Sequence, residues 1–557
     1  MKRSILTTVS ALALMVGGQA FAQANNSTVS QNGTDQTATV NQTGSADTST
    51  VTQENDGNTA TINQAGGLGG TSTVTQTGAG NTANVDQTDD GDDGYYAGNS
   101  VPPSYTSTIS QSGNANSASV AQNTQSQLFS NDSTINQSGN ENTTSVTQFD
   151  DEQDSTVNQA SNNNSATVTQ GVDQNGTDTS FNNSSVVNQG GGDYNIAVVS
   201  QTGNSNDSDV NQQGAANDAS VGQSGNGNFA DVDQLGSNAS ASVSQGGNNN
   251  DAIVLQQDDA GGDATVDQSG SDNLANVSQT SLNSVANVDQ LGNGNSVDLD
   301  QGRSAGNQFQ TNGQQALITQ SGNNNDVIAS QTGSSGDLNI DQSGNDNFAD
   351  VSQSGFDNSA GDNAALVGIS QSGNNNDAFV TQSGQLSDAF IDQIGSGNTA
   401  TINQSVANDP NLPGNDPRVV TASITQGGDS NTSTINQFET PAGNAPNPGS
   451  ERLMSATSTQ SGSNNNSLIN QTNSLIDGPS SGNEATVAQA GDGNLSDLFQ
   501  DGASNEATVA QEGDGNFSYV DQLGSGNTAS VSQYSDGNTS TVYQAGSGHT
   551  ATVTQGM

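Results

Sequence analysis

The sequence predicts an all-β fold, a β-solenoid of stacked strand-turn-strand circuits that is amyloid-like and carries loop insertions. Three observations indicate it: glutamine returns every eleven residues, valine or isoleucine stands two residues before it, and glycine and asparagine follow it in phase. A repeat this short cannot bury an apolar face alone, so its copies must stack. The C-terminal repeats place these residues at Gln489, Gln500, Gln511, Gln522, Gln533, Gln544 and Gln555; Asn494, Asn505, Asn516, Asn527 and Asn538; Val509, Val520, Val531, Val542 and Val553; and Gly502, Gly513 and Gly524.

Each eleven-residue unit is predicted to form one strand and one turn. In the segment 527–533, Asn527, Ala529, Val531 and Gln533 alternate with hydroxyl residues. Because strand side chains alternate between faces, these four residues are expected to face inward. The segment 523–526, Leu-Gly-Ser-Gly, is expected to reverse the chain, since glycine takes positive φ without a steric penalty.

Two units make one circuit of about 22 residues, and circuits stacked about 4.8 Å apart place Gln on Gln and Asn on Asn. Each buried carboxamide is therefore predicted to donate to the copy above it and accept from the copy below. Valine and alanine are expected to fill the space between these ladders. About forty glutamines keep the pattern, so nearly all of the chain after its N-terminus is repeat.

The composition alone argues for disorder, because only 28% of the 557 residues are hydrophobic and 4% are aromatic. The periodicity outweighs this indication. Before assembly, however, a largely unfolded soluble chain is expected, since each unit buries little surface to offset the cost of ordering the backbone. The chain has no cysteine, which excludes disulfides and thiolate metal sites.

The domain organisation predicted from the sequence is a secretion signal peptide at 1–22 followed by the repeat solenoid at 23–557. The N-terminal segment has basic residues, an apolar stretch and a small-x-small site ending at Ala22. No later segment has the apolar length needed to span a bilayer as a helix. Loop insertions, which a solenoid tolerates at its turns, are expected near 88–106, 171–184, 302–316, 405–422 and 438–457.

The repeats resemble those of curlin, the amyloid subunit of bacterial curli fibres, whose signature is S-x5-Q-x-G-x-G-N-x-A-x3-Q. The signature is matched closely by two runs: Gln522, Gly524, Gly526, Asn527, Ala529 and Gln533, and Gln393, Gly395, Gly397, Asn398, Ala400 and Gln404. The resemblance covers nearly everything after the signal segment, and the chain would be an unusually long member of the family.

The resemblance implies an extracellular structural amyloid of a Gram-negative-type bacterium. Its fibres would build biofilm matrix and mediate adhesion and cell aggregation. The partners it implies are further copies of the same chain in a homopolymeric fibre, a nucleator subunit and an outer-membrane secretion pore. The alternative is a monomeric calcium-stabilised β-roll or surface adhesin. Calcium rolls use G-G-x-G-x-D-x-U-x turns, of which the sequence holds only weak echoes such as the segment 246–251.

The formal charge of −52 makes nucleic acid an unlikely partner. Many aspartates directly precede the ladder glutamine and are expected to face outward, where they would keep the chain soluble and hinder premature edge pairing. A sharper hypothesis is that divalent cations or lowered pH switch assembly by neutralising stacked aspartates, such as Asp267 and Asp289, which lie one circuit apart. These charge gatekeepers are Asp233, Asp267, Asp289, Asp341, Asp392 and Asp521.

Catalysis has little support in the sequence. The single histidine, His549, takes the position of a ladder asparagine and is interpreted as a repeat variant. The acidic run 89–93 next to Tyr95 and Tyr96 could bind calcium, but its spacing fits no EF-hand and a solvated loop is the better interpretation. The sequence therefore predicts no enzyme, no cofactor and no metal site.

Overall fold

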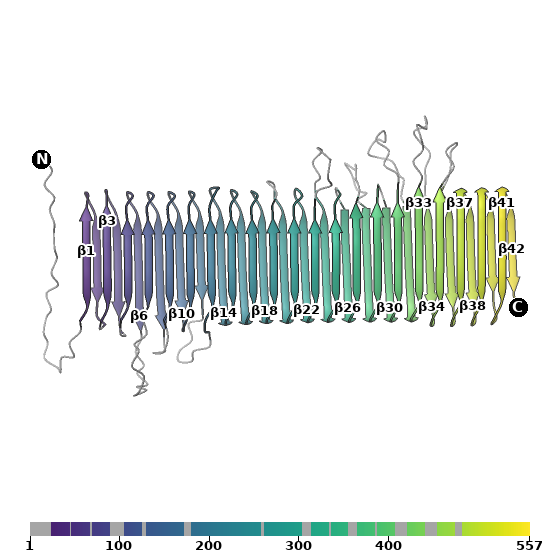
Figure 1. Ribbon diagram of the computed structural model, residues 1–557, viewed down its shortest axis with the longest axis horizontal. Helices are drawn as coiled ribbons and strands as arrows, with labels where there is room; N and C mark the ends of the chain where they lie inside the picture. The colour runs from purple at the N-terminus through teal and green to yellow at the C-terminus, as the bar shows by residue number, and fades with distance from the viewer. Residues whose placement is uncertain are drawn as a thin grey trace, which may run out of the picture. The chain divides into compact units, whose positions relative to one another are not determined.

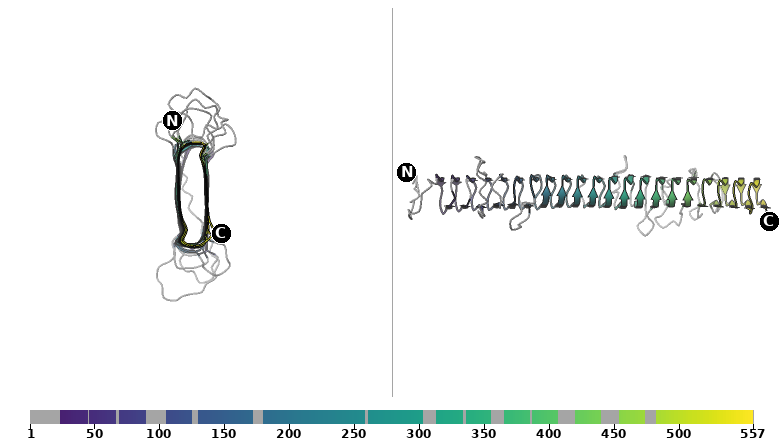
Figure 2. Two further views of the ribbon diagram at one scale, coloured as in Figure 1. Left: turned by 90° about the vertical axis from the view of Figure 1, so that its right-hand side faces the viewer. Right: turned by 90° about the horizontal axis from the view of Figure 1, so that it is seen from below.

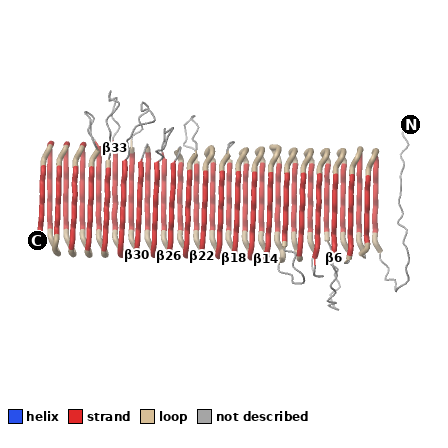
Figure 3. Tube along the Cα trace, turned by 180° about the vertical axis from the view of Figure 1, so that it is seen from behind, coloured by secondary structure: helices blue, strands red, loops and turns tan. Residues whose placement is uncertain are grey.

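The computed structural model describes residues 24–44, 46–66, 69–89, 105–124, 130–171, 180–257, 261–302, 313–333, 336–354, 365–384, 387–406, 420–439, 454–473 and 482–556. Within these ranges the chain is all-β and contains no helix (Figure 3). The chain divides into two compact units, unit 1 at Met1–Asp272 and unit 2 at Asn273–Met557. Each unit is a β-solenoid with two parallel sheets, one of odd-numbered and one of even-numbered strands.

Unit 1 contains ten described strands in each sheet. The odd-numbered strands are β1 Asn26–Asn32, β3 Thr48–Glu54, β5 Thr71–Gln76, β7 Thr106–Gln111, β9 Asp132–Gln137, β11 Asp154–Gln159, β13 Ser184–Gln189, β15 Asp207–Gln212, β17 Phe229–Gln234 and β19 Asp251–Gln256. The even-numbered strands are β2 Thr37–Gln42, β4 Thr59–Ala65, β6 Thr82–Asp89, β8 Ser117–Thr124, β10 Thr143–Phe149, β12 Ser165–Gln170, β14 Ile196–Asn204, β16 Asp218–Asn226, β18 Ser240–Asn248 and β20 Asp263–Ser271.

Unit 2 contains eleven described strands in each sheet. The odd-numbered strands are β21 Leu274–Gln279, β23 Ser296–Gln301, β25 Asp326–Gln331, β27 Phe348–Ser354, β29 Asp377–Ser383, β31 Thr399–Ser405, β33 Thr432–Glu439, β35 Asn466–Asn473, β37 Leu495–Ala503, β39 Phe517–Ser525 and β41 Thr539–Ser547. The even-numbered strands are β22 Val285–Asn293, β24 Gln315–Asn323, β26 Gly336–Asn345, β28 Ala365–Asn374, β30 Ser387–Ser396, β32 Val420–Asp429, β34 Ser455–Ser461, β36 Glu484–Ala490, β38 Glu506–Glu512, β40 Thr528–Gln533 and β42 Thr550–Gln555.

Within each unit, every strand pairs in parallel and in register with the strand two positions along the chain (Figure 1). In β38 and β40, for example, Val509 pairs with Val531 and Gln511 pairs with Gln533. Seen end-on, one circuit has two long sides, its two strands, joined by short arcs (Figure 2). The 22-residue spacing of these pairs confirms the predicted solenoid of strand-turn-strand circuits.

The core of each unit lies between its two sheets. In β40 the residues Ala529, Val531 and Gln533 are buried, while the alternate residues Ser530 and Ser532 are half-buried on the outer face. The same alternation recurs in unit 1, where Ala230, Val232 and Gln234 of β17 are fully buried. Since side chains alternate along a strand, the period-two pattern of the sequence becomes a thin dry interior of valine, alanine and amide groups.

The predicted insertions lie mostly outside the described residues, and so does the predicted signal peptide at 1–22. The strands on either side of each predicted insertion nevertheless keep the register. Gln76 of β5 pairs with Gln111 of β7, although they are 35 residues apart. Gln393 of β30 likewise pairs with Gln426 of β32 across 33 residues. An added segment between two strands therefore leaves the stacking of the circuits unchanged.

Candidate functional site: the buried amide ladders

Glutamine side chains form one continuous hydrogen-bonded ladder along each sheet of a unit. In the even-numbered sheet of unit 2, Nε2 of Gln489 donates to Oε1 of Gln511 (2.9 Å), and Gln511 donates to Gln533 (3.0 Å). In the odd-numbered sheet, Gln500 donates to Gln522 and Gln522 to Gln544, both at 2.9 Å. Six of the seven C-terminal ladder glutamines are buried, and Gln555 is half-buried. Each buried amide thus provides the hydrogen-bond partner that the neighbouring buried amide needs.

The second N–H of each ladder glutamine reaches the opposite sheet, which the sequence reasoning missed. Nε2 of Gln533 in β40 also donates to the carbonyl of Phe517 in β39 (3.0 Å), and Nε2 of Gln522 donates to the carbonyl of Glu506 in β38 (2.9 Å). The partner is the first residue of the preceding strand, sixteen residues earlier. The spacing is sixteen where no insertion intervenes and lengthens across one, to 23 for Gln489 and 29 for Gln111. The recurrence of sixteen is the signal that could have revealed this bond. The ladder glutamines therefore join the two sheets by hydrogen bonds, in addition to bonding to one another along each sheet.

The asparagine side chains bond mainly to backbone groups of the neighbouring circuits, whereas the sequence predicted bonds between one side-chain amide and the next. Oδ1 of Asn505 accepts the backbone N–H of Asn527 (3.1 Å), and Oδ1 of Asn494 accepts that of Asn516 (3.0 Å). Nδ2 of Asn527 donates to the carbonyl of Gly546 in the next arc (3.1 Å), with a direct amide contact to Asn505 besides. The asparagine side chain is one methylene shorter than glutamine, so it bonds mainly the backbone. Asn494, Asn505, Asn516 and Asn527 are buried, and Asn538 is half-buried.

The arc glycines take backbone conformations that only glycine adopts readily. Gly502, Gly513 and Gly524 have φ of 122°, 94° and 115°. A Cβ on Gly524 would lie 2.0 Å from the carbonyl oxygen of Gly546 in the next circuit. The strand reversal predicted at 523–526 is mostly part of a strand, because β39 continues to Ser525 and its arc residues pair with those of β41. The arcs are thus part of the ladder and not loose turns.

The ladder valines fill the interior between the amides. Val509, Val520 and Val531 have no exposed surface, Val542 is 4% exposed and Val553 in the end strand is half-buried. Burying a valine side chain contributes roughly 1.5–3 kcal/mol. The exposure at β42 marks the point where the stack of described circuits ends.

The predicted gatekeeper aspartates all lie on the outer face, either exposed or half-buried. Asp233, Asp341, Asp392 and Asp521 pair with neutral residues in the neighbouring strands. Nδ2 of Asn211 also donates to Oδ1 of Asp233 (3.0 Å). These four therefore do not stack on one another. Asp267 lies in β20 of unit 1 and Asp289 in β22 of unit 2.

Acidic residues do stack elsewhere, at positions that the sequence reasoning passed over. Asp209 pairs with Asp231, and Asp132 with Asp154. Burial, and then the charges of Asp233 and Asp209, raise the pKa of Asp231 to about 6. Burial and then the charge of Asp132 raise the pKa of Asp154. Two acids 22 residues apart at the same strand position are the signal that could have identified these pairs.

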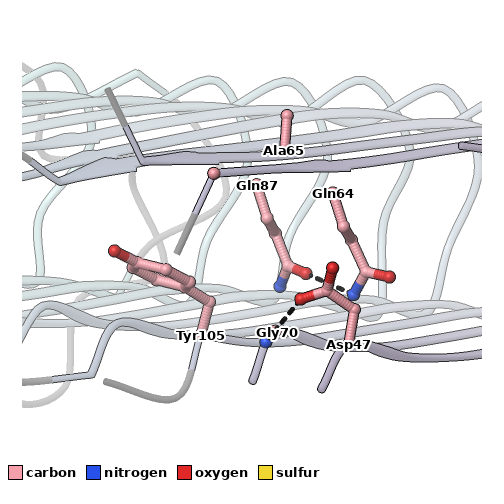
Figure 4. Close-up of a pocket in the computed structure, with 7 residues that line it drawn as sticks. Asp47, Gln64, Ala65, Gly70, Gln87 and Tyr105 are labelled. Carbon is pink, nitrogen blue, oxygen red and sulfur yellow. Dashed lines mark hydrogen bonds between the residues drawn. The ribbon is translucent and has the colours of Figure 1, made fainter. Parts of the chain in front are cut away.

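The asparagine ladder of unit 1 is interrupted at three successive circuits, where its position holds Asp47, Gly70 and Tyr105 (Figure 4). Asp47 is 3% exposed, its N–H donates to Oδ1 of Asn25 (3.1 Å), and its Oδ1 accepts the N–H of Gly70 (3.2 Å). Its Oδ2 makes no hydrogen bond. Burial raises the pKa of this carboxyl, an effect that the N–H groups of Gly70 and Gly44 partly oppose.

The single histidine takes the place of a ladder asparagine in the described part of the chain. His549 is exposed, and its backbone N–H donates to Oδ1 of Asn527 (3.0 Å), the bond that a ladder asparagine makes. Among the described residues, no three His, Cys, Asp or Glu side chains are grouped so that they could hold a metal ion. The described chain also has no helix of a length and apolarity that would cross a membrane. The acidic run 89–93 with Tyr95 and Tyr96 lies almost wholly outside the described residues.

Comparison with known families identifies the same repeat. Four segments match the curlin associated repeat: residues 214–247, 344–384, 502–534 and 527–556. They lie in both units and include the C-terminal ladder described above. No curated protein matches the chain.

Proposed function

We propose that this chain, four segments of which match the curlin associated repeat, is an extracellular structural amyloid subunit that self-assembles by edge-strand templating into curli-like fibres. Such fibres would serve biofilm matrix, adhesion and cell aggregation. The principal partner is a second copy of the chain, with a nucleator subunit and an outer-membrane secretion pore as further partners. Export would use the signal peptide predicted at 1–22.

The observation that carries this proposal is the common direction of the ladders. Every bond between two glutamine side chains described above runs from Nε2 of one residue to Oε1 of the next toward the C-terminus. In the first circuit, Gln31 and Gln42 donate to Gln53 and Gln64 in the same sense. The first circuit of unit 1 therefore presents amide oxygens outward along the axis, and the last circuit of unit 2 presents amide N–H groups.

These two ends are chemically complementary. Nε2 of Gln544 and of Gln555 donates to the carbonyls of Thr528 (2.9 Å) and Thr539 (2.8 Å), the same cross-sheet bonds as in the interior circuits. The remaining N–H of each amide points along the ladder, where interior glutamines meet the next Oε1. A second copy could supply that oxygen from its first circuit, so the ladder would continue from one chain to the next.

Incomplete burial of the end circuits gives the driving force. Val29 and Gln42 are half-buried and Gln31 is exposed, whereas Val51 and Gln53 one circuit further in are fully buried. At the other end, Val553 and Gln555 are half-buried. Covering these residues with another circuit removes apolar surface from water at about 25 cal/mol per Å². An exposed parallel edge of this kind is a template for a further strand.

Seeded growth tests the proposal. Val553→Lys places a charge on the inner face of the end strand β42, where the residue is only half-buried, so the unit folds while stacking on its end is blocked. Thr552→Lys on the outer face of the same strand is the matched control. Thioflavin fluorescence of seeded monomer should rise rapidly for wild type and Thr552→Lys and stay low for Val553→Lys. Equal growth of all three proteins would refute end templating.

The same experiment distinguishes the calcium-stabilised roll. Growth is followed with added calcium and with a chelator, and the soluble fraction is measured by sedimentation. Fibres that grow equally under both conditions support the amyloid subunit. A monomer that stays soluble and folds only with calcium would support the alternative.

A further inference from the structure

The position that precedes each strand is normally a ladder asparagine whose Nδ2 fills a fixed place. Nδ2 of Asn58, for example, donates to the carbonyl of Glu54 and to the arc carbonyl of Gly78, both at 2.7 Å. In the circuit of β3 this position holds Asp47. A carboxylate has no hydrogen to donate, so an oxygen stands where the other circuits place an N–H donor.

Gly70 opens a small cavity beside this carboxylate. A Cβ on Gly70 would lie 3.0 Å from Oε1 of Gln87, 3.2 Å from Nε2 of Gln64 and 3.5 Å from Oδ1 of Asp47. The cavity has a volume of about 10 Å³, and Tyr105 of the next circuit closes one side of it (Figure 4). This is about the room that one water-sized particle needs. The space is therefore bounded by side-chain oxygens of Asp47 and Gln87 and by the amide nitrogen of Gln64.

The buried charge needs a partner that the described chain does not provide. Asp47 is 3% exposed and its Oδ2 has no hydrogen bond. The described residues include no lysine or arginine, and their single histidine, His549, belongs to unit 2. Leaving an unpaired carboxylate buried costs several kcal/mol. Among the described residues, no basic side chain can supply this counter-charge.

We propose that the cavity between Asp47, Gly70 and Gln87 binds one small monovalent cation of the sodium or ammonium class, which completes the interrupted ladder. One carboxylate and one neutral amide oxygen beside the volume of a single water suit a singly charged ion that has shed most of its hydration shell. Calcium takes six to eight oxygen ligands and magnesium retains several waters, so neither suits the cavity. The raised pKa of Asp47 agrees with a carboxylate that has no counter-charge in the protein.

Hydrogen exchange of the full folded chain tests the site locally. The amide of Gly70 donates to Oδ1 of Asp47 and so reports directly on the carboxylate. At pH 7 its exchange should be several-fold slower in sodium chloride than in tetramethylammonium chloride of the same ionic strength, because the larger ion cannot enter. A parallel series in ammonium chloride separates the two candidate ions. Protection by one or both of them supports the site.

Two variants make the test specific. Asp47→Asn supplies the usual amide, and Gly70→Asn fills the cavity while keeping the carboxylate, so both should abolish the sodium-dependent protection. Asp233→Asn, on the outer face of β17, is the control and should retain it. Equal exchange of wild type in all three salts would overturn the proposal. Protection that is absent at pH 7 and appears only at lower pH would also overturn the proposal, since a proton would then neutralise Asp47.

Discussion

Two regions of unit 1 place their carboxylates on opposite sides of the same sheet. Across β5 and β7, the outer face of the odd-numbered sheet carries Thr71, Thr73, Thr75, Thr106 and Thr108 in register and no acid, while Asp47 is buried in the adjacent circuit. Across β15 to β19 the asparagine ladder inside is unbroken, with Oδ1 of Asn206 and of Asn228 accepting the backbone N–H groups of Asn228 and Asn250. The acids there lie on the outer face, at Asp207, Asp209, Asp231, Asp233 and Asp251.

This difference separates what holds the fold from what the chain can vary. Both regions keep the same parallel register, although one exterior is neutral and the other strongly acidic. Gln76 and Gln212 make nearly identical bonds, each donating 2.8 Å to the next glutamine. The interior therefore specifies the stacking of the circuits, and the charge of the exterior can vary without changing that stacking.

Arc glycines should give the largest effect, and equally in both regions. A Cβ on Gly78, in the neutral region, would lie 1.7 Å from the carbonyl oxygen of Gly113, and one on Gly225, in the acidic region, 1.9 Å from that of Gly247. Because backbone must move, Gly78→Ala and Gly225→Ala should each lower local stability by about 3 kcal/mol or more. Local opening free energies from hydrogen exchange measure this.

Gly80→Ala is the matched control. Gly80 has a φ of 68° and no atom within 4 Å of an added Cβ, so only the left-handed conformation is penalised, by about 1–2 kcal/mol. A loss as large as that of Gly78→Ala would mean that close packing of the arcs is not what requires glycine.

The ladder glutamines should give the next largest effect. Gln76→Leu and Gln212→Leu each leave a buried amide partner without its bond, at a cost of about 1–3 kcal/mol. The two losses should agree within about 0.5 kcal/mol if the exterior has no influence on the core. Thr73→Val, on the outer face of β5, is the control and should change stability by less than about 0.5 kcal/mol. Clearly unequal losses would show that the acidic exterior weakens the core beneath it.

Sequence reasoning recovered the solenoid because the period of eleven and the alternation of Val and Gln are local patterns. It did not recover the backbone bonds of Asn527, because they depend on the reach of a shorter side chain. The acid pair Asp209 and Asp231 and the buried Asp47 were missed for another reason. They depend on which residue lies 22 or more positions away, across insertions whose length varies.

The acidic region should be the more sensitive to pH. The pKa of Asp231 is raised from 3.8 to about 6, so its protonated form favours the folded state. The resulting stability is fully present below pH about 4 and is lost as the pH rises through about 6. Hydrogen exchange in β15 to β19 should therefore speed up over this window after correction for the intrinsic rate. Asp231→Asn should reduce the change, with the remainder due to Asp209 and Asp251, whose pKa values burial also raises. The exchange of β7 should not show the change. A flat profile in wild type would contradict a coupled acid cluster.

The smallest effect concerns the origin of the two raised pKa values. Like charges of Asp233 and Asp209 contribute to the shift of Asp231, whereas for Asp47 burial is the only cause that raises the pKa. Asp233→Asn should therefore lower the pKa of Asp231 and leave that of Asp47 unchanged, as read from carboxyl carbon chemical shifts in an NMR titration. Added tetramethylammonium chloride should act in the same way, because salt screens exposed charges far more than buried ones. Parallel shifts of both groups would mean that Asp47 also responds to the acidic exterior.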